Sequence, residues 1–482
     1  MIAKAFSKIT WILWVLLVVV LPITTFPLVM KLTGSSSVAP ASLLFLIPLI
    51  AILLPFVFIK KITLPVHVKS VLLFFLFAFG TILLAFLRPI PDYKEQSLIN
   101  AAVEGVATLV LGLFFYLATV VILHSPARIE KTLRIINWTG LFLVIWSIVQ
   151  VNAKEYFPSL FIFLENIRPF FSPTRILSDR ILGFASEPSW FAHMLNLVYL
   201  AYWLAAVYTR KSVHRIIVWK FILEDVLLVL GVIALVGSLS RGGLMAFMMV
   251  IGLIFILLNL RLIKWIVRKF HGRRKVVFTA GVSVGLFIVY IGLLIAALWG
   301  LSKIDPRMQN VFNFKSNEPN ALLEYADTLQ FGERVIYWQT GWNIFNDHPI
   351  IGVGVGLSGF YFQQYLPDIG WEMAESRELL YQYLGLMNIK NLWSRLLAET
   401  GIVGFALFVN FLVLFGFTSS EMINRSSGFR KTLGYMGVFM LMALIAEELS
   451  VDSFALPYFW FTLGLVTAAW RYYLPVRGET SG

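Results

Sequence analysis

The sequence predicts an all-α membrane protein that crosses the bilayer about 12 times and carries one large folded loop outside it. Three observations support this fold class. Hydrophobic residues make up 59% of the 482 residues and charged residues only 13%, unlike the composition of a soluble domain. The mean hydropathy is +0.82. Apolar runs of about 20 residues, the length that a helix needs to cross a bilayer, recur along the chain.

Twelve segments are long and apolar enough to be membrane spans. The first one follows Lys4 and Lys8 and lacks a small-residue cleavage site, so we interpret it as a span and not as a signal peptide. The predicted spans are 11–30, 41–59, 68–87, 99–123, 133–150, 187–208, 215–237, 242–260, 277–300, 391–418, 432–449 and 453–471.

An even number of spans places both termini on one side of the membrane. The segments that share this side hold 24 of the 39 basic residues but only five of the 26 acidic residues. Because basic segments stay in the cytoplasm, this asymmetry predicts cytoplasmic termini. It also accounts for the net charge of +13 without a nucleic-acid partner. The chain has no cysteine, which excludes disulfides and thiolate chemistry.

The chain is predicted to form one integral membrane unit, 1–482, with two loops on the extracytoplasmic side. These loops are 151–186 and 301–390, and the second is longer than a connector needs to be. Loops of this length are usually functional or disordered, and the helical pattern within 301–390 favours a folded one.

One amphipathic helix is predicted in the larger loop over 320–347, begun by Pro319 and ended by His348. The glycine-rich stretch IIGVGVGLSGF follows it. Its glycines fit a G-x-G-x-x-G spacing, but no strand–turn–helix unit surrounds them, so we interpret the stretch as a tight turn and not as a dinucleotide site.

Arg241 stands at the start of a predicted span, directly before two glycines. One interpretation is an arginine whose side chain extends from the bilayer to the interface. The other is a phosphate ligand, since a guanidinium binds phosphate through two hydrogen bonds and the glycines permit close approach. Arg334, beside aromatic residues on the loop helix, is a second candidate for contacting phosphate or sugar. Arg180 and Trp338 are further candidates, because arginines are concentrated on the outer side beside aromatic residues, which suit sugar faces.

The stretch GFASEPSWFAHML places Glu187 at the start of a predicted span, before Pro188. Its carboxylate could cap the amides of the first helical turn. The same carboxylate, close to the membrane boundary and followed by Trp190 and Phe191, also suits a general base. The two roles are compatible.

A second polar stretch, IKNLWSRLLAETGIVG, begins the predicted span 391–418. Arg395 and Glu399 are four residues apart, which predicts an ion pair within the helix. Lys390 and Asn391 lie at the junction of loop and span, where both a functional role and interfacial anchoring are open.

Three acidic residues, Glu447, Glu448 and Asp452, cluster near the end of another span. Carboxylates in such a group can hold a divalent cation. Pairing with the arginines of the same side is the simpler expectation.

The order of these motifs resembles the O-antigen ligase and polymerase family of bacterial surface-polysaccharide enzymes. The resemblance covers mainly 183–465 and rests on four motifs in sequence: an Arg-Gly-Gly span start, a loop helix with R-x-x-x-W, a glycine turn after His-Pro, and Lys-Asn followed by E-x-G-x-x-G. It implies an all-helical membrane glycosyltransferase of the GT-C type that uses sugars carried on undecaprenyl pyrophosphate.

The resemblance also implies roles for individual residues. Arg241 and Arg334 match arginines that handle the pyrophosphate, and His348 matches the histidine of the turn. Ligases typically have His-Asn where this chain has Lys390-Asn391, and a protonated lysine cannot accept a proton. Because SEPSWFA resembles a stretch of polymerases, we expect a polymerase in which Glu187 is the base.

The predicted reaction is an inverting transfer of glycan from undecaprenyl pyrophosphate to a sugar hydroxyl, without metal or cofactor. The predicted catalytic residues are Glu187, Arg241 and Arg334, and the predicted substrate-binding residues are Arg180, Trp338, His348, Lys390, Asn391 and Arg395.

Besides membrane lipid and the lipid-linked oligosaccharide, the predicted partners include a chain-length regulator. We expect the protein in the bacterial cytoplasmic membrane, with its active site outside the cytoplasm. Two alternatives stay open: a ligase that transfers glycan to the lipid A core, and a transporter of the lipid-linked unit, which would carry charges deep within several spans.

Overall fold

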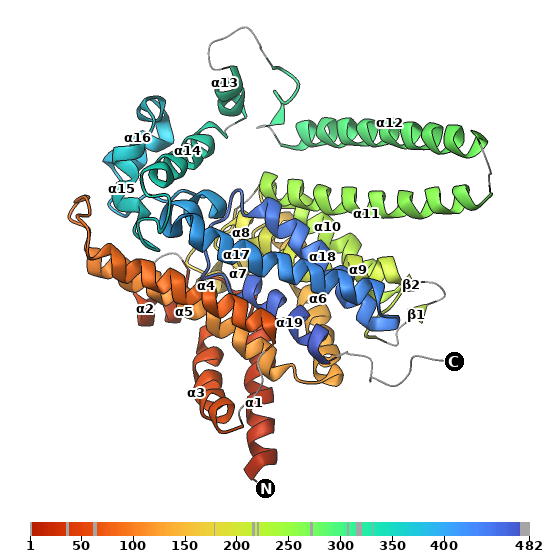
Figure 1. Cartoon of the computed structure of the whole chain (residues 1–482), viewed down its shortest axis with the longest axis horizontal. Helices are drawn as coiled ribbons and strands as arrows, with labels where there is room; N and C mark the ends of the chain where they lie inside the picture. Colours follow the sequence, from red (N-terminus) through yellow and green to blue (C-terminus); the bar gives the residue numbers. More distant parts are fainter. Residues whose placement is uncertain are drawn as a thin grey trace.

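The computed structural model describes residues 2–34, 38–60, 65–177, 179–214, 217–218, 221–269, 273–305, 308–314, 321–329 and 331–472. In this part of the chain the fold is all-α apart from one short hairpin, as the sequence predicts. Figure 1 shows a bundle of long helices, with α13 to α16 gathered at one end of it and the hairpin at the other.

The helices follow one another along the whole chain. They are α1 (Ile2–Val19), α2 (Pro27–Thr33), α3 (Leu43–Lys60), α4 (Val66–Ala85), α5 (Leu98–Ile122), α6 (Pro126–Tyr156), α7 (Pro158–Ile167), η1 (Arg168–Phe170), α8 (Pro188–Met194), the π-helical turn η2 (Leu195–Leu200), α9 (Ala201–Thr209), α10 (Leu223–Gly237), α11 (Arg241–Lys269), α12 (Arg273–Ile304), α13 (Ala321–Thr328), α14 (Gly332–Asp347), α15 (Ser358–Tyr365), η4 (Asp368–Trp371), α16 (Ala374–Tyr381), α17 (Leu392–Asn424), α18 (Gly428–Glu447) and α19 (Pro457–Tyr472). The strands β1 (Ile217–Val218) and β2 (Phe221–Ile222) pair antiparallel.

Eight helices among the described residues are long and apolar enough to cross a membrane. They are α4, α5, α6, the continuous helix α8–η2–α9, α11, α12, α17 and α18. The four other predicted spans correspond to α1 and α3, which contain the shorter apolar helices Phe6–Val19 and Leu43–Pro55, and to α10 and α19, which have 15 and 16 residues. The chain is therefore a multi-pass membrane protein.

The centre of the bundle is formed by α19, which packs against α5 and α18. Tyr458 and Trp460 are fully buried there. A Cβ added at Gly112 of α5 would lie 2.4 Å from Nε1 of Trp460, so this glycine is what lets the indole reach the helix backbone. Small residues of this kind allow close helix packing in a membrane.

Several predicted spans have different boundaries, and two of them are interrupted or begin later than predicted. The span 11–30 is interrupted, because α1 ends at Val19 and a turn precedes α2, whose first residue is Pro27. A proline lacks the N–H that a continuing helix would require, but it suits a helix start. The span 215–237 begins only at Leu223, because the hairpin precedes it.

The larger loop also differs from its prediction. The segment 320–347 forms two helices, α13 and α14, and Pro319 lies outside the described residues. The break falls at Phe331, whose N–H donates to Ala326 O at 2.7 Å and closes the first helix with a turn. His348 ends α14 as predicted. The smaller loop 151–186 contains the last turn of α6, then α7 and η1.

A kink in α17 connects the larger loop, 301–390, to the bundle. Gly401 has φ 61° and ψ −169°, a conformation outside the helix region. The kink frees the carbonyls of Ala398 and Glu399, which accept hydrogen bonds from the N–H groups of Val353 and Gly354 at 2.9 Å each. The glycine-rich stretch therefore forms a turn that docks on the interrupted helix α17. This agrees with its interpretation as a tight turn.

Candidate functional site

Arg241 is the first residue of α11. Its Nη1 donates to the carbonyl of Leu329, which lies just after α13 in the large loop. The two following glycines are closely packed. A Cβ added at Gly242 would lie 2.5 Å from Ser450 Oγ, and one added at Gly243 would lie 2.5 Å from the Cβ of Ala192. The start of α11 is thus held between the large loop, the segment after α18 and the first helix of the SEPSW stretch.

Arg334 reaches the same place from α14. Its Nη1 donates to the carbonyl of Ser450 at 3.1 Å. Since Gly242 lies against the hydroxyl of Ser450, this serine contacts both arginine-bearing helices. Arg241 and Arg334, distant in sequence, therefore lie on two helices that both contact Ser450.

Trp338 lies one helical turn after Arg334. Its ring meets Phe331 edge-on at 5.3 Å. Within the described part of the chain, its indole Nε1 is buried and has no hydrogen-bond partner. A buried donor without a partner costs about 1–3 kcal/mol, so an acceptor from a ligand would be favoured here.

Arg180 adds a third guanidinium on the other side of the junction between α10 and α11. Its Nε donates to Ser238 O at 3.1 Å and its Nη2 to Leu239 O at 3.3 Å. Ser238 and Leu239 precede Arg241 by only two or three residues. Backbone carbonyls thus accept hydrogen bonds from all three guanidinium groups, those of Arg180, Arg241 and Arg334.

Glu187 occupies the N-cap position of α8, but its carboxylate makes no capping hydrogen bond. Instead, Oε2 accepts a hydrogen bond from Ser189 Oγ at 3.0 Å. The prediction that the carboxylate of Glu187 caps the amides of the first helical turn is therefore wrong. The side chain is exposed at the end of the helix that packs against Gly243 through Ala192, which brings it to the region of Arg241.

Arg168, which the sequence did not single out, fixes the stretch before Glu187. It is buried and donates to the carbonyls of Thr174 and Ala185 at 2.9 Å each, and to that of Gly183. Burial lowers the pKa of this guanidinium to about 10. A loop arginine with these contacts looks like any other in sequence, because its partners are backbone atoms.

The three residues predicted around the start of α17 have protein partners. The ammonium of Lys390 pairs with Glu375 and lies 5.2 Å from the centre of the Tyr337 ring. Asn391 is the N-cap of α17, where its Oδ1 accepts from the N–H of Ser394 at 3.0 Å. The N-cap accounts for Asn391 structurally.

Arg395 forms the predicted ion pair within α17, with Nε 3.0 Å from Glu399 Oε1. Its Nη1 also lies 3.5 Å from Asp452 Oδ2. Two carboxylates therefore neutralise this arginine. Through Asp452, Arg395 also holds the segment after α18 that contains Ser450.

Two members of the acidic cluster are paired differently from the expectation. Asp452 does pair with an arginine, but Glu447 accepts from Asn196 and Glu448 lies 3.3 Å from His193 Nε2. Helix α8–η2–α9 provides both partners. Among the described residues, no three acidic or histidine side chains are grouped to hold a metal ion.

His348 lies at the end of α14, away from Ser450. Its ring meets the Tyr361 ring edge-on at 5.5 Å. Burial, and next the charge of Arg88, lower the pKa of His348, whereas Asp347 raises it by a smaller amount. The ring is therefore held neutral between α14 and the glycine-rich turn.

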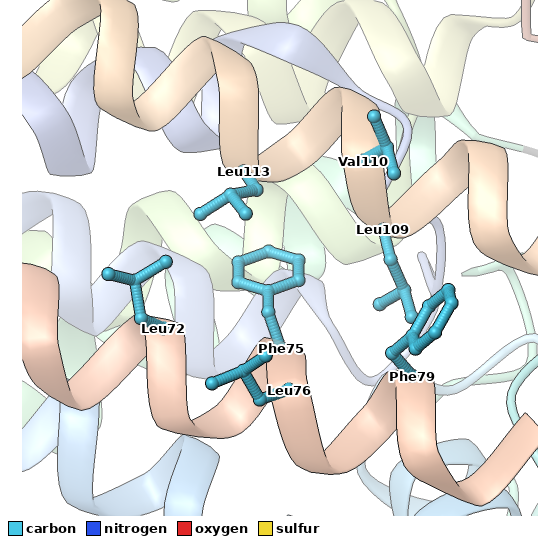
Figure 2. A pocket seen from close by; sticks show the side chains of 7 residues that line it. All are labelled: Leu72, Phe75, Leu76, Phe79, Leu109, Val110 and Leu113. Atoms are coloured by element: carbon cyan, nitrogen blue, oxygen red, sulfur yellow. The ribbon is translucent and has the colours of Figure 1, made fainter. Parts of the chain in front are cut away.

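Two apolar hollows lie on the surface of the bundle. Figure 2 shows the smaller one, of about 180 Å³, where Leu72, Phe75 and Phe79 of α4 face Leu109 and Leu113 of α5. None of the predicted site residues lines it.

The larger hollow, of about 590 Å³, lies between α17 and α18. Val413 and Phe417 line it, and Trp393 and Ile445 line it near the site, where Trp393 Nε1 donates to Ile445 O at 3.2 Å. We call it the α17–α18 groove.

Together, the fold and the site define a multi-pass helical membrane protein with an arginine-rich site where a large loop meets the ends of its spans. A family model described as O-antigen ligase matches residues 226–409. This match, over less than half of the chain, supports membership of the O-antigen ligase and polymerase family, a family of glycosyltransferase-like enzymes. A search among curated proteins found no match. The matched region includes Arg241 and Arg334 but not Glu187.

Proposed function

We propose that the protein is a polysaccharide polymerase that transfers glycan from undecaprenyl pyrophosphate to a sugar hydroxyl of another lipid-linked repeat unit. One observation carries the proposal: the helix that begins with Arg241 and the helix that carries Arg334 both contact Ser450, and Arg180 bonds to carbonyls two and three residues before Arg241. Guanidinium groups bind phosphate oxygens through paired hydrogen bonds and keep their charge. A diphosphate is a ligand with enough negative charge to match them.

In the proposed reaction, the oxygen of the acceptor hydroxyl forms a bond to the anomeric carbon while the bond from that carbon to the phosphate oxygen breaks. The hydroxyl proton passes to the carboxylate of Glu187. The electron pair of the broken bond stays on the lipid diphosphate, whose growing charge Arg241 and Arg334 stabilise. Attack from the side opposite the leaving group inverts the anomeric configuration. The arginines supply the positive charge that a divalent ion supplies in many transferases, so we propose a metal-independent reaction.

Trp338 and its neighbours suit the sugar. An indole offers an apolar face for the C–H side of a pyranose and an N–H for a hydroxyl oxygen. The partnerless Nε1 of Trp338 supports this role. For Lys390, Asn391 and Arg395, whose side chains have protein partners, we propose that they shape the acceptor side of the site.

The α17–α18 groove supports a lipid-linked donor. It is lined by apolar side chains, and its Trp393 end lies two residues from Arg395. A hydrocarbon chain bound there would leave its diphosphate near the arginines. We propose that this end of the bundle faces away from the cytoplasm, with both termini inside, in the bacterial cytoplasmic membrane.

Replacing Glu187 by Gln tests the base. The variant keeps the shape of the side chain but cannot accept the proton, so polymer should be lost while single lipid-linked units accumulate. A general base contributes typically about 10²- to 10⁴-fold to the rate. Glu165→Gln, at an exposed glutamate of α7, is the matched control and should leave chain length unchanged. Long chains in the Glu187→Gln strain would refute the assignment.

A ligase is the second candidate, and the description of the matching family favours it. The products separate the two: loss of a ligase leaves long lipid-linked chains, whereas loss of a polymerase leaves single units. Purified protein that lengthens lipid-linked units without an ion gradient would exclude a transporter.

A further inference from the structure

Helix α8–η2–α9 carries two polar side chains on a buried face. His193 is fully buried and Asn196 is 3% exposed. Asn196 lies in the π-helical turn η2. Such turns widen a helix locally and often occur at functional sites. Polar groups buried in a membrane protein are costly unless they have partners, so the partners indicate what the face does.

The amide of Asn196 joins three helices. Its Nδ2 donates to the carbonyl of Gly243 at 2.8 Å and to Oε1 of Glu447 at 2.5 Å. Gly243 is two residues after Arg241 in the first turn of α11, and Glu447 is the last residue of α18. One side chain thus connects the helix that carries Arg241 to the helix that leads to Ser450.

Close packing leaves the start of α11 no room to move toward α8. A Cβ at Gly243 would lie 2.5 Å from Ala192, one helical turn before Asn196. The hydrogen bond from Asn196 to Gly243 O holds the same turn of α11.

A second polar pair fixes the end of α18. His193 Nε2 lies 3.3 Å from Glu448 Oε1, and both side chains are buried. The next residues of the chain lead to Ser450, whose carbonyl accepts from Arg334. The same face of α8–η2–α9 therefore sets the place of both arginine contacts.

We infer that Asn196, together with Glu447, is a positioning pair that holds Arg241 where it meets the diphosphate. Neither side chain needs to touch the substrate for this role. The inference rests on the proposed function of Arg241, and it adds residues that no motif indicates.

A matched buried asparagine distinguishes positioning from general stability. Asn137 of α6 is also fully buried and also donates to a glutamate, with Nδ2 2.9 Å from Glu224 Oε1. Its Oδ1 accepts from Trp203 Nε1 at 2.9 Å. This pair has the same chemistry, and none of its hydrogen bonds within the described residues reaches α11, so its removal should affect stability without affecting Arg241.

The test is a double-mutant cycle on the full chain, purified and reconstituted in vesicles with a lipid-linked repeat unit. Asn196→Ala and Asn137→Ala are each made alone and with Arg241→Lys, and Tm, kcat and KM are measured. We expect both asparagine variants to lower Tm. Asn196→Ala should lower kcat/KM by up to about 100-fold, because a misplacement of about 1 Å at a reacting group can cost that much.

The coupling between the asparagine substitution and Arg241→Lys distinguishes positioning from a general effect on stability. In the Arg241→Lys background, Asn196→Ala should cause little further loss, whereas the effect of Asn137→Ala should be the same in both backgrounds. Equal losses from Asn196→Ala in both backgrounds would overturn the inference and leave the proposed function intact. Full activity of Arg241→Lys and Arg241→Ala would overturn the proposed function and the inference with it.

If Asn196→Ala does not fold, variants of Glu447 test the same positioning role. Glu447→Gln keeps an oxygen that can accept from Asn196 and should retain activity near that of the native protein. Glu447→Ala removes it and should lose activity. Equal loss in both variants would overturn the inference, because the acceptor would then not matter.

Discussion

Replacing Gly401 by Ala should destabilise the protein strongly, because the kink in α17 requires a glycine. With φ 61° and ψ −169°, the residue occupies a region that is nearly restricted to glycine. Forcing another residue into such a region costs about 1–3 kcal/mol.

A clash adds to this cost. The new Cβ would lie 2.3 Å from the carbonyl carbon of Ile350, which is backbone and cannot rotate away. Shifting Ile350 would also strain the bonds that dock the turn, from Val353 N–H to Ala398 O and from Ile402 N–H to Pro349 O. Each buried group left without a partner costs about 1–3 kcal/mol, so the total loss should reach at least about 3 kcal/mol.

Thermal unfolding in detergent measures the effect on stability, and polymer formation in vesicles measures the effect on activity. Gly285→Ala is the matched control, since a Cβ at this position of α12 meets nothing within 4 Å. Alanine favours a helix over glycine by about 0.5–1 kcal/mol, so Tm should stay constant or rise in the control. A Gly401→Ala variant with the Tm of the native protein would refute the argument from the kink.

Two further predictions concern residues that hold the loops. Arg168→Met should lower the free energy of unfolding by at least about 1–3 kcal/mol, because three carbonyls lose their donor. Arg175→Met, at an exposed position, should change it by less than about 0.5 kcal/mol. Thermal unfolding of both variants checks this prediction, and equal Tm values would contradict it. The lowered pKa of His348 means that the unfolded chain binds more protons below about pH 6.5, so stability should fall as the pH drops through that value toward the folded pKa. His348→Phe should show a smaller difference in Tm between about pH 7.5 and pH 5 than the native protein. An unchanged difference would show that His348 does not cause this pH dependence of stability.

The spans were predictable because hydropathy is a local property and a bilayer sets one length for all helices. The break after Val19 lies within a run that is as apolar as a span, so hydropathy does not show it. The stretch 215–225, in contrast, carries Arg215, Lys220, Glu224 and Asp225, and these charges were a signal that the span begins later. The split between α13 and α14 depends on one turn at Phe331, which an amphipathic pattern on both sides conceals.

The site was predictable in its residue types but not in its contacts. An arginine before two glycines is visible in a sequence, as are a loop arginine near aromatic residues and an acid at a helix start. The partners that bring them together are backbone carbonyls, such as those of Leu329 and Ser450, and every residue has a carbonyl. For the same reason Arg168 had no signature. Asn196 could have been noticed as a polar residue within an apolar span.

Ser450 has a consequence for how the chain can change. Its hydroxyl lies against one arginine-bearing helix and its carbonyl bonds to the arginine of another. It stands between the end of α18 at Glu447 and the start of α19 at Pro457, both of which are buried. Adding or deleting one residue there would carry the serine away from at least one helix. The number of residues between α18 and α19 is therefore constrained, although the composition of the stretch between them does not indicate this constraint.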